Sequence, residues 1–479
     1  MIAGFLLACL APAATPPVQE ERTMAAVPKV VEPAWVSTFV VGPTSGPPDT
    51  PCEGKLETES PGVPGSSPSA AGDLDPATFP RVDLKAGAAN TGVDAAIRDR
   101  ALLPLELARL PVEPLRGDAE DIAAVRRVFT RAGESEDPVR LGFWGASHIA
   151  GEYFTGQLRR DLQTRYGDAG HGFVMPVSPW KGYRASDVNL CSHGLWVTDF
   201  DRRSGGRNDG MLGPGGMSVE SSAASAYGWV QTTKENPQGR EVSRFEVLFL
   251  HQPRGGVLRM QVDDAPPVEV PTVGDFGPGA VVLKVVPGPH RLTVSPKGDG
   301  PVRLVGLNLE REGRGVIVDA MGVNGRTVSS WERWHAEQFS AFFARRPEDL
   351  VVLAYGTNEA NDGGFTPEGY RARLEAGLQK MRSLFPTTPC LLIGPGDRGK
   401  KIRDQSYAIW TPNGQVAAIQ RELGPRFDCA TWDQQAAMGG PGSVLAWWKA
   451  TPSLMAGDLI HFTAAGYQEL ARRFLAEAG

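Results

Sequence analysis

Two patterns of hydrophobic and polar residues divide this chain. In the first, short apolar runs that lie before a glycine predict buried strands, at residues 139–145, 316–320, 350–356 and 390–395. Between them lie longer segments with apolar residues on one helical face, at residues 148–167, 330–346, 367–385 and 463–478. Because strands alternate with helices, this pattern predicts an α/β fold whose parallel sheet is covered by helices on both faces.

The second pattern fills residues 195–312, where short strands recur at regular spacing between turns rich in Gly, Pro and Asp. Regular short strands of this kind predict a β-sandwich, here of jelly-roll-like form. The α/β pattern stops before this block and resumes after it. We therefore predict that residues 195–312 are inserted into an α/β domain made of residues 95–194 and 313–479, rather than forming the second of three sequential domains.

The chain ahead of these domains has a different composition. Residues 14–94 are rich in Pro, Gly, Ser, Ala and Thr and show almost no apolar periodicity, which predicts a flexible leader or linker. Residues 95–133 then show short helical patterns, in which Ile122, Val125 and Phe129 share one helical face. The folded part of the chain is predicted to begin here.

The first residues are the one candidate targeting segment. Residues 1–13 contain an apolar stretch that is too short to span a bilayer, and no Lys or Arg precedes Cys9. They predict, from a weak signal, a secreted, periplasmic or envelope-anchored protein. No later segment is apolar enough to predict an integral membrane span.

Composition excludes several classes of protein. At 479 residues the chain exceeds what one core organises, and its 41% hydrophobic and 22% charged content is ordinary for globular domains. The net charge of -6 arises without a basic stripe, so nucleic acid is not a predicted partner. The five cysteines show no CxxC pair and no metal-ligand spacing with histidine, so neither a metal nor another cofactor is predicted. Cys390 is expected to be a small buried residue, and a bond between Cys191 and Cys429 is left open.

Candidate chemistry starts at the sequence GASH, residues 145–148, which joins a predicted strand to a predicted helix. A serine at such a turn exposes its hydroxyl at the carboxyl edge of the sheet, near backbone N–H groups that can bind an oxyanion. Ser147 is therefore a candidate nucleophile, although a helix cap is the commoner role for serine at this position.

A carboxylate and an imidazole follow near the end of the chain. Asp458 and His461 lie three residues apart in the segment before the final helix. This spacing lets the carboxylate bind one imidazole nitrogen while the other accepts a proton from serine. Without the GASH turn, His461 would more simply be a surface residue and Thr463 a helix cap.

Two more loops follow predicted strands. The sequence GVNGRT, residues 322–327, contains Gly325, whose backbone N–H can approach a ligand closely, and YGTNEAN, residues 355–361, contains Asn358, whose side chain can donate to an oxyanion. Taken singly, each of these segments would be read as a turn.

In this order, the GASH, GVNG, GTNE and DLIH segments resemble the four blocks of the SGNH/GDSL hydrolase family. The resemblance implies a flavodoxin-like three-layer α/β/α fold and a catalytic triad of Ser147, His461 and Asp458. It also implies an oxyanion hole from the Ser147 N–H, the Gly325 N–H and the Asn358 side chain. The family's usual Gly-Asp-Ser is Gly-Ala-Ser here, because Ala146 replaces the aspartate, so one supporting hydrogen bond is expected to be lost.

The stretches at residues 147–174 and 290–325 are further similar to bacterial peptidoglycan O-acetylesterases whose hydrolase domain carries an inserted module like those that bind carbohydrate. This resemblance implies a serine esterase that removes acetyl or other short acyl groups from a carbohydrate, such as a cell-envelope glycan. An O-acyltransferase with the same triad and a decayed glycan-binding protein remain open. The inserted domain is expected to bind the glycan or, alternatively, to buttress the GVNG loop.

Some residues near these segments are expected to surround the substrate. His148 is not a candidate base, because adjacent side chains diverge at such a turn, and it is expected to pack or hydrogen-bond beside the site. Trp447 and Trp448 precede Asp458 and are candidates, together with His148, to line an acyl or sugar pocket. Most of the eleven tryptophans are expected to lie in the core.

Overall fold

The α/β part of the protein is built on a five-stranded parallel sheet. The computed structural model describes residues 32–53, 56–59, 75–85, 94–200, 207 and 209–479. The sheet contains, in spatial order, β15 (Val316–Gly322), β4 (Val139–Gly145), β16 (Leu350–Ala354), β17 (Cys390–Ile393) and β20 (Cys429–Trp432). In chain order this arrangement is 2-1-3-4-5, the flavodoxin-like order, and every pairing is parallel. The predicted α/β fold class is confirmed.

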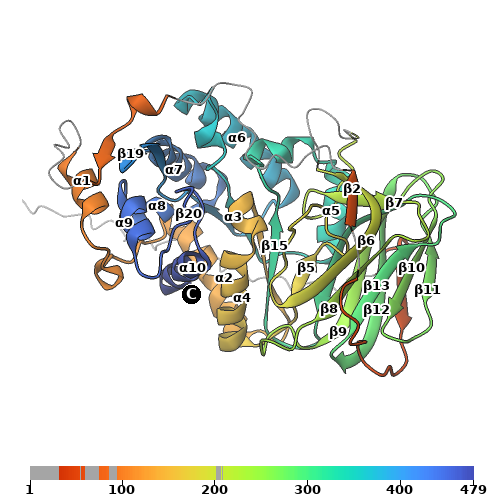
Figure 1. The fold of residues 1–479 in the computed structure, drawn as a ribbon. Helices are drawn as coiled ribbons and strands as arrows, with labels where there is room; N and C mark the ends of the chain where they lie inside the picture. The colour runs from red at the N-terminus through yellow and green to blue at the C-terminus, as the bar shows by residue number, and fades with distance from the viewer. Residues whose placement is uncertain (1–31, 54–55, 60–74, 86–93, 201–206, 208) are drawn as a thin grey trace, which may run out of the picture. The chain divides into compact units, whose positions relative to one another are not determined.

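Helices cover both faces of this sheet (Figure 1). One face packs against α2 (Ala119–Glu134), α4 (Tyr153–Tyr166) and α10 (Ala464–Ala478), and the other against α5 (Ala336–Arg345), α6 (Pro367–Leu384) and α7 (Pro412–Leu423). The strands are apolar on both faces, because successive side chains point to opposite sides. In β17, Leu391 and Ile393 join the first group of helices, while Cys390 and Leu392 join the second.

Two of the predicted helices are interrupted. The segment at residues 148–167 divides into α3 (Ser147–Ala150) and α4, because Glu152 takes a left-handed conformation with φ of 52°. The buried Glu152 carboxylate accepts hydrogen bonds from Arg159 and from the Ser186 N–H, which supports this backbone bend. The segment at residues 330–346 begins as the 3-10 helix η3 (Val328–Arg333) before α5 starts.

The β-rich part forms one continuous sheet of twelve strands. Its strands after α4 are β5 (Gly172–Val174), β6 (Val188–Asp199), β7 (Ser218–Ser221), β8 (Tyr227–Thr232), β9 (Val242–His251), β10 (Val257–Val262), β11 (Val268–Pro271), β12 (Gly277–Gly288), β13 (Arg291–Pro296) and β14 (Val302–Glu310). Alternate residues of β8 and β10 are buried, and both halves of the sheet contribute to one core, as a sandwich requires.

These strands lie in the crossover between β4 and β15. The predicted boundary at residue 195 falls inside β6, and β5 already pairs with β14, so the β-rich sheet starts before the predicted insertion does. Its core is also continuous with that of the α/β part, since Phe173, Trp144 and Trp331 belong to a single buried cluster. Residues 34–479 accordingly form one compact unit. The division into separate domains stays a prediction.

The prediction of a structureless linker at residues 14–94 is wrong for three segments. β1 (Val36–Val40) adds to β12, β2 (Leu56–Glu59) adds to β6, and β3 (Arg81–Asp83) pairs with β19 (Ser406–Ile409) beside β18 (Gly399–Arg403). Such short strands gain their stability from the sheet edges they join, so local periodicity does not reveal them. The candidate signal segment, residues 1–13, lies outside the described residues.

The remaining elements complete the α/β part. They are η1 (Pro76–Thr78), α1 (Ala95–Leu102), η2 (Leu107–Arg109), η4 (Glu359–Asn361), η5 (Gly424–Phe427), α8 (Gln434–Ala437) and α9 (Ser443–Lys449). In the part of the chain that the structure describes, no helix has both the length and the apolar character needed to cross a bilayer.

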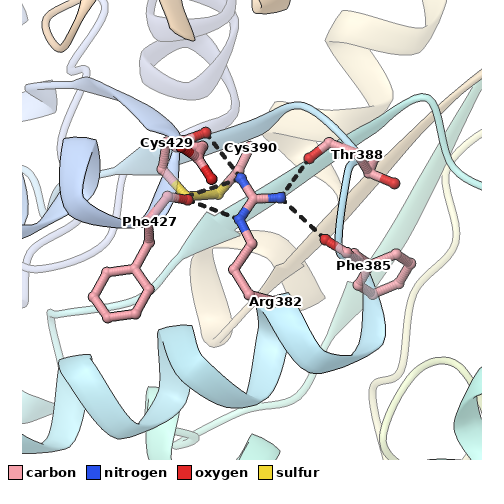
Figure 2. The surroundings of a disulfide bond; sticks show 7 residues. Arg382, Phe385, Thr388, Cys390, Phe427 and Cys429 are labelled. Carbon is pink, nitrogen blue, oxygen red and sulfur yellow. Dashed lines mark hydrogen bonds between the residues drawn. A yellow bond between two sulfur atoms is a disulfide. The ribbon is translucent and has the colours of Figure 1, made fainter.

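Two disulfides decide the question that the sequence left open about cysteine pairing. Cys52 bonds to Cys191, and Cys390 bonds to Cys429 across the adjacent strands β17 and β20. Figure 2 shows Arg382 of α6 beside the second disulfide, where its guanidinium donates to the carbonyl oxygens of Phe385, Thr388, Phe427 and Asp428. This arginine therefore ties α6 to the ends of the strands that the disulfide joins.

A buried guanidinium connects the β-rich part to the α/β sheet. Arg346, which follows α5, binds Asp319 of β15 and lies 2.6 Å from Glu310 of β14 and 3.4 Å from Glu348. Burial by itself lowers the pKa of Arg346, but the surrounding carboxylates raise it above its usual range. Burial raises the pKa of Glu310, but Arg140, Arg346 and Arg244 outweigh this effect and hold it below its usual range.

We expect Arg346→Met to lower the free energy of unfolding by about 3 to 5 kcal/mol, because it leaves buried carboxylates without their counter-charge. Urea unfolding followed by circular dichroism measures this difference. As a control, Arg109→Met removes an exposed ion pair with Glu106 and should leave the unfolding midpoint unchanged. Equal midpoints for the two variants would contradict the role assigned to Arg346.

Candidate active site

The turn after β4 positions Ser147. Gly145 ends the strand, and a Cβ at this position would lie 2.7 Å from the Ala354 carbonyl oxygen, so no larger residue fits. Helix α3 then begins at Ser147, with the Ile149 and Ala150 N–H groups both donating to the Ala146 carbonyl oxygen. The serine thus lies at the carboxyl edge of the sheet, next to the point where the strand order reverses between β4 and β16.

Ser147 and His461, which are 314 residues apart, meet at this edge. Ser147 Oγ is 2.8 Å from His461 Nε2, and His461 Nδ1 is 2.6 Å from Asp458 Oδ2. The imidazole therefore bridges the hydroxyl and the carboxylate, an arrangement that can take a proton from serine and stabilise the resulting imidazolium. The structure brings together the three residues that the sequence predicted as a triad.

The loop of residues 458–461 is fixed by its own hydrogen bonds. The second oxygen of Asp458 accepts from the Ile460 and His461 N–H groups at 2.9 and 3.0 Å. Leu459, which follows Asp458, has a left-handed backbone with a φ of 57°. Partial burial raises the pKa of Asp458, but the hydrogen bonds from His461 and Ile460 outweigh this effect and bring it below its usual range. The carboxylate is therefore ionised near neutral pH, as an orienting group should be.

The two loops expected to form the oxyanion hole also meet. The Val323 N–H donates to the Gly145 carbonyl oxygen, which joins the end of β15 to the end of β4. Gly325 is exposed with a φ of 72°, and Asn358 Nδ2 donates to the Arg326 carbonyl oxygen at 2.8 Å. An amide nitrogen carries two N–H donors, so this bond orients Asn358 and uses only one of them.

Glu359 holds these loops in place, a role that the sequence analysis missed. Its buried carboxylate accepts from the Val328 N–H at 2.9 Å and from the Gly356 N–H at 3.0 Å, so it links the loop after β15 to the loop after β16. Burial raises the pKa of Glu359, while these backbone hydrogen bonds oppose the rise. The sequence signal for Glu359 was its position directly after Asn358, in the loop that follows a buried strand.

His148 lies beside the triad and is not part of it. Its Nδ1 is 2.9 Å from the Tyr467 hydroxyl, and its ring centroid is 5.2 Å from that of His461. Burial, and then the nearby His461, lower the pKa of His148 to about 3, so His148 is neutral at physiological pH. This agrees with the expectation that it packs and hydrogen-bonds beside the site. Tyr467 was not identified from the sequence.

The prediction that Trp447 lines a substrate pocket is wrong. Trp447 is fully buried, and its indole N–H donates to the Met438 carbonyl oxygen. Its ring packs against Phe462, so it belongs to the core under the His461 loop. Trp448 is half-buried and packs against Tyr407, and its role in a pocket stays a prediction. Trp144, Trp331 and Trp334 are buried, as expected.

Comparisons with known proteins agree with this geometry. Residues 293–469 match the model of the GDSL-like lipase/acylhydrolase family. The match includes Gly325, Asn358, Asp458 and His461, whereas Ser147 precedes it because the β-rich strands separate β4 from β15. A search of curated proteins finds no match for this chain.

Among solved structures, one described as a peptidoglycan O-acetylesterase in action is 24% identical, with a TM-score of 0.62, and the alignment covers 76% of this chain and 97% of that one. An acetyl xylan esterase is 19% identical over 34% of this chain and 79% of its own, with a TM-score of 0.26. A family two carbohydrate esterase from Cellvibrio japonicus is 11% identical, covers 63% and 95%, and has a TM-score of 0.23. The first of these likenesses establishes the fold.

The fold and the family model together define the class of the protein. Residues 293–469 match the model of the GDSL-like lipase/acylhydrolase family, and this match, together with the fold and the geometry at Ser147, supports a serine hydrolase of the SGNH class.

We expect Glu359→Gln to lower the free energy of unfolding by roughly 1 to 3 kcal/mol, because an amide offers only one acceptor and leaves a buried N–H unpaired. The rate constant kcat should also fall, since Asn358 loses its fixed position. Thermal unfolding and ester hydrolysis measure the two effects. The matched control is Glu368→Gln, an exposed carboxylate in the first turn of α6, which should change neither quantity. An unchanged kcat in Glu359→Gln would show that the clamp does not position the site.

Proposed function

We propose that this hydrolase removes acetyl or other short acyl groups from a carbohydrate, through a covalent acyl-enzyme formed on Ser147. The observation that carries the proposal is the hydrogen-bonded series Ser147 Oγ, His461 and Asp458, with separations of 2.8 and 2.6 Å. A site that had lost its activity would be expected to lose residues of the triad, and all three are present here, so a decayed glycan-binding protein is not favoured.

The proposed mechanism follows from the positions of these groups. With the Nδ1 proton shared with Asp458, His461 Nε2 accepts the proton of Ser147 as Oγ attacks the acyl carbon. The oxyanion that forms accepts hydrogen bonds from the Ser147 and Gly325 N–H groups and from Asn358. His461 then protonates the sugar oxygen as its bond to the acyl carbon breaks. Water attacks the acyl-serine with His461 as base, which releases the carboxylic acid and restores the Ser147 hydroxyl.

A cell-envelope glycan is the proposed substrate. The similar solved structure is described as a peptidoglycan O-acetylesterase, and two disulfides are typical of proteins outside the reducing cytosol. Side chains of Asp458 and His461 that are 45% and 39% exposed leave room for a large substrate at the triad. The same opening would admit a sugar hydroxyl in place of water, so products formed with and without an added acceptor distinguish the esterase from an acyltransferase.

We propose that the inserted strands both support the loops of the site and bind a polymeric glycan. The Arg326 guanidinium lies 5.9 Å from the Phe200 ring centroid, and the His335 N–H donates to the Gly210 carbonyl oxygen. Behind the nucleophile, the Trp144 indole N–H donates to the Pro214 carbonyl oxygen. Because the core is shared, replacing these strands with a linker would expose apolar surface of the α/β part, so surface substitutions are the appropriate test of glycan binding.

Labelling with a fluorophosphonate tests the nucleophile directly, since this reagent bonds only to an activated serine. We expect one labelled site in the parent, at Ser147. Ser147→Ala should abolish labelling and lower hydrolysis of an aryl acetate by several orders of magnitude without changing the thermal midpoint. His461→Ala should lose nearly as much and Asp458→Asn less. Ser383→Ala, an exposed serine on α6, is the control. Retention of more than about a tenth of the activity by Ser147→Ala would refute the assignment.

Asn358→Ala should lower kcat by about 100- to 1000-fold with little change in KM, because an oxyanion donor acts mainly in the transition state. Steady-state kinetics with an aryl acetate measure both constants. Asn361→Ala, three residues later in η4, should leave them near the parent values. If Asn358→Ala changed only KM, Asn358 would be a substrate-binding residue.

A further inference from the structure

The arginine at position 184 has an unusual setting. Arg184 is exposed, and its guanidinium carbon lies 4.4 Å from the centroid of the Tyr153 ring. In the described part of the chain, no carboxylate pairs with this guanidinium. Most arginines around the β-rich strands differ in this respect, as Arg160 does by binding Asp187 and Arg303 by binding Asp209.

A row of aromatic rings connects Arg184 to the triad. Tyr153 is stacked nearly parallel on Tyr467, at 9° with 5.8 Å between centroids. The Tyr467 hydroxyl lies 2.9 Å from His148 Nδ1, and the His148 ring lies beside that of His461. Arg184 therefore lies at one solvent-facing end of a row of contacts that passes through the partly buried His148 and ends at His461.

The loop that carries Arg184 is fixed on both sides. Immediately before it, the Tyr183 hydroxyl accepts a hydrogen bond from the Met175 N–H, and the Tyr183 ring packs edge-on against Trp180. Two residues after it, Ser186 binds the buried Glu152 through both its N–H and its hydroxyl. Since Glu152 directly precedes Tyr153, the loop is held next to the ring on which Arg184 rests.

The chemistry of this arrangement favours a carboxylate ligand. A guanidinium that lies over a ring uses its flat face for the contact, and its N–H donors in the plane remain able to bind both oxygens of a carboxylate. The chain as a whole carries a charge of -6, and Asp458 adds a negative charge at the triad, so the protein does not attract an acidic substrate in general. An acidic sugar would need a local cation of this kind.

We propose that Arg184, supported by Tyr153, forms a subsite that binds a carboxylate of the substrate, so that the enzyme prefers acyl esters on acidic sugars over those on neutral ones. This inference rests on the proposed esterase function and adds the charge of the substrate to it. Arg184 acts in binding and takes no part in the bond-breaking steps.

The test compares the release of acetate from an O-acetylated hexuronic acid and from its methyl ester, in which a neutral ester group replaces the carboxylate. Arg184→Gln should raise KM for the acid about tenfold, the factor that corresponds to about 1.4 kcal/mol, with kcat unchanged. Hydrolysis of the methyl ester and of an aryl acetate should stay at the parent values. Arg184→Lys, which keeps the charge and loses the planar fork, should fall between the parent and Arg184→Gln.

Lys181→Gln is the matched control, because Lys181 is an exposed cation three residues earlier in the same loop. It should behave like the parent, and an effect equal to that of Arg184→Gln would reduce the subsite to general positive charge. Equal losses on the acid and the methyl ester would show that Arg184 is only structural, and no change on either would remove the subsite. A parent that hydrolyses the aryl acetate but neither sugar ester would also overturn this proposal. A parent that hydrolyses no ester would instead refute the proposed function.

Discussion

The burial of Arg346 among carboxylates is the interaction on which the arrangement of the site depends. Asp319 belongs to β15, next to the nucleophile strand β4, whereas Glu310 belongs to β14 of the β-rich sheet. Because Arg346 pairs with carboxylates from both β15 and β14, it restricts how these two strands can lie relative to each other. A shift of either strand would leave a buried carboxylate without its counter-charge. Asp319 also accepts from the Phe173 N–H at 2.6 Å, which fixes β5 of the β-rich sheet against the same point.

The position of β15 in turn determines how the loops of the site come together. Its register against β4 puts Gly322 opposite Gly145, and a Cβ at Gly322 would lie 2.2 Å from the Ala150 N–H nitrogen. This close approach brings helix α3, with Ser147 at its start, directly against the strand whose end carries the glycine loop. Three loops from neighbouring strands then converge at one edge of the sheet, and Glu359 ties two of them together.

This construction gives the β-rich strands a structural part in catalysis even without direct contact with the substrate. They share a core with the α/β sheet, and the Phe200 ring lies 5.9 Å from the guanidinium of Arg326 in the loop of residues 322–327. The loop between β5 and β6 also carries Arg184, which lies over Tyr153 at the opposite end of the aromatic row from His461. An insertion in a crossover connection is well placed for this purpose, since both of its ends return to strands next to the nucleophile.

The sequence by itself determined four of the five parallel strands, most of the helices that cover them and the candidate residues of the triad. Long apolar runs and helical periodicity report burial that depends mainly on neighbouring residues, and the short GASH and DLIH segments carry their chemistry in residue type. The order of those segments along the chain was enough to predict that Ser147, Asp458 and His461 meet, and the structure brings them within hydrogen-bonding distance.

Only the tertiary structure decided how distant segments complete one another. β1, β2 and β3 are stable because they join sheet edges formed by residues 280–284, 194–197 and 406–408, and β20, only four residues long, depends in the same way on β17. Cysteine pairing, the burial of Trp447 and the clamp by Glu359 likewise depend on groups far apart in the chain. Local sequence records which residues prefer to be buried, but the partner that satisfies each buried group is chosen when the chain closes around it.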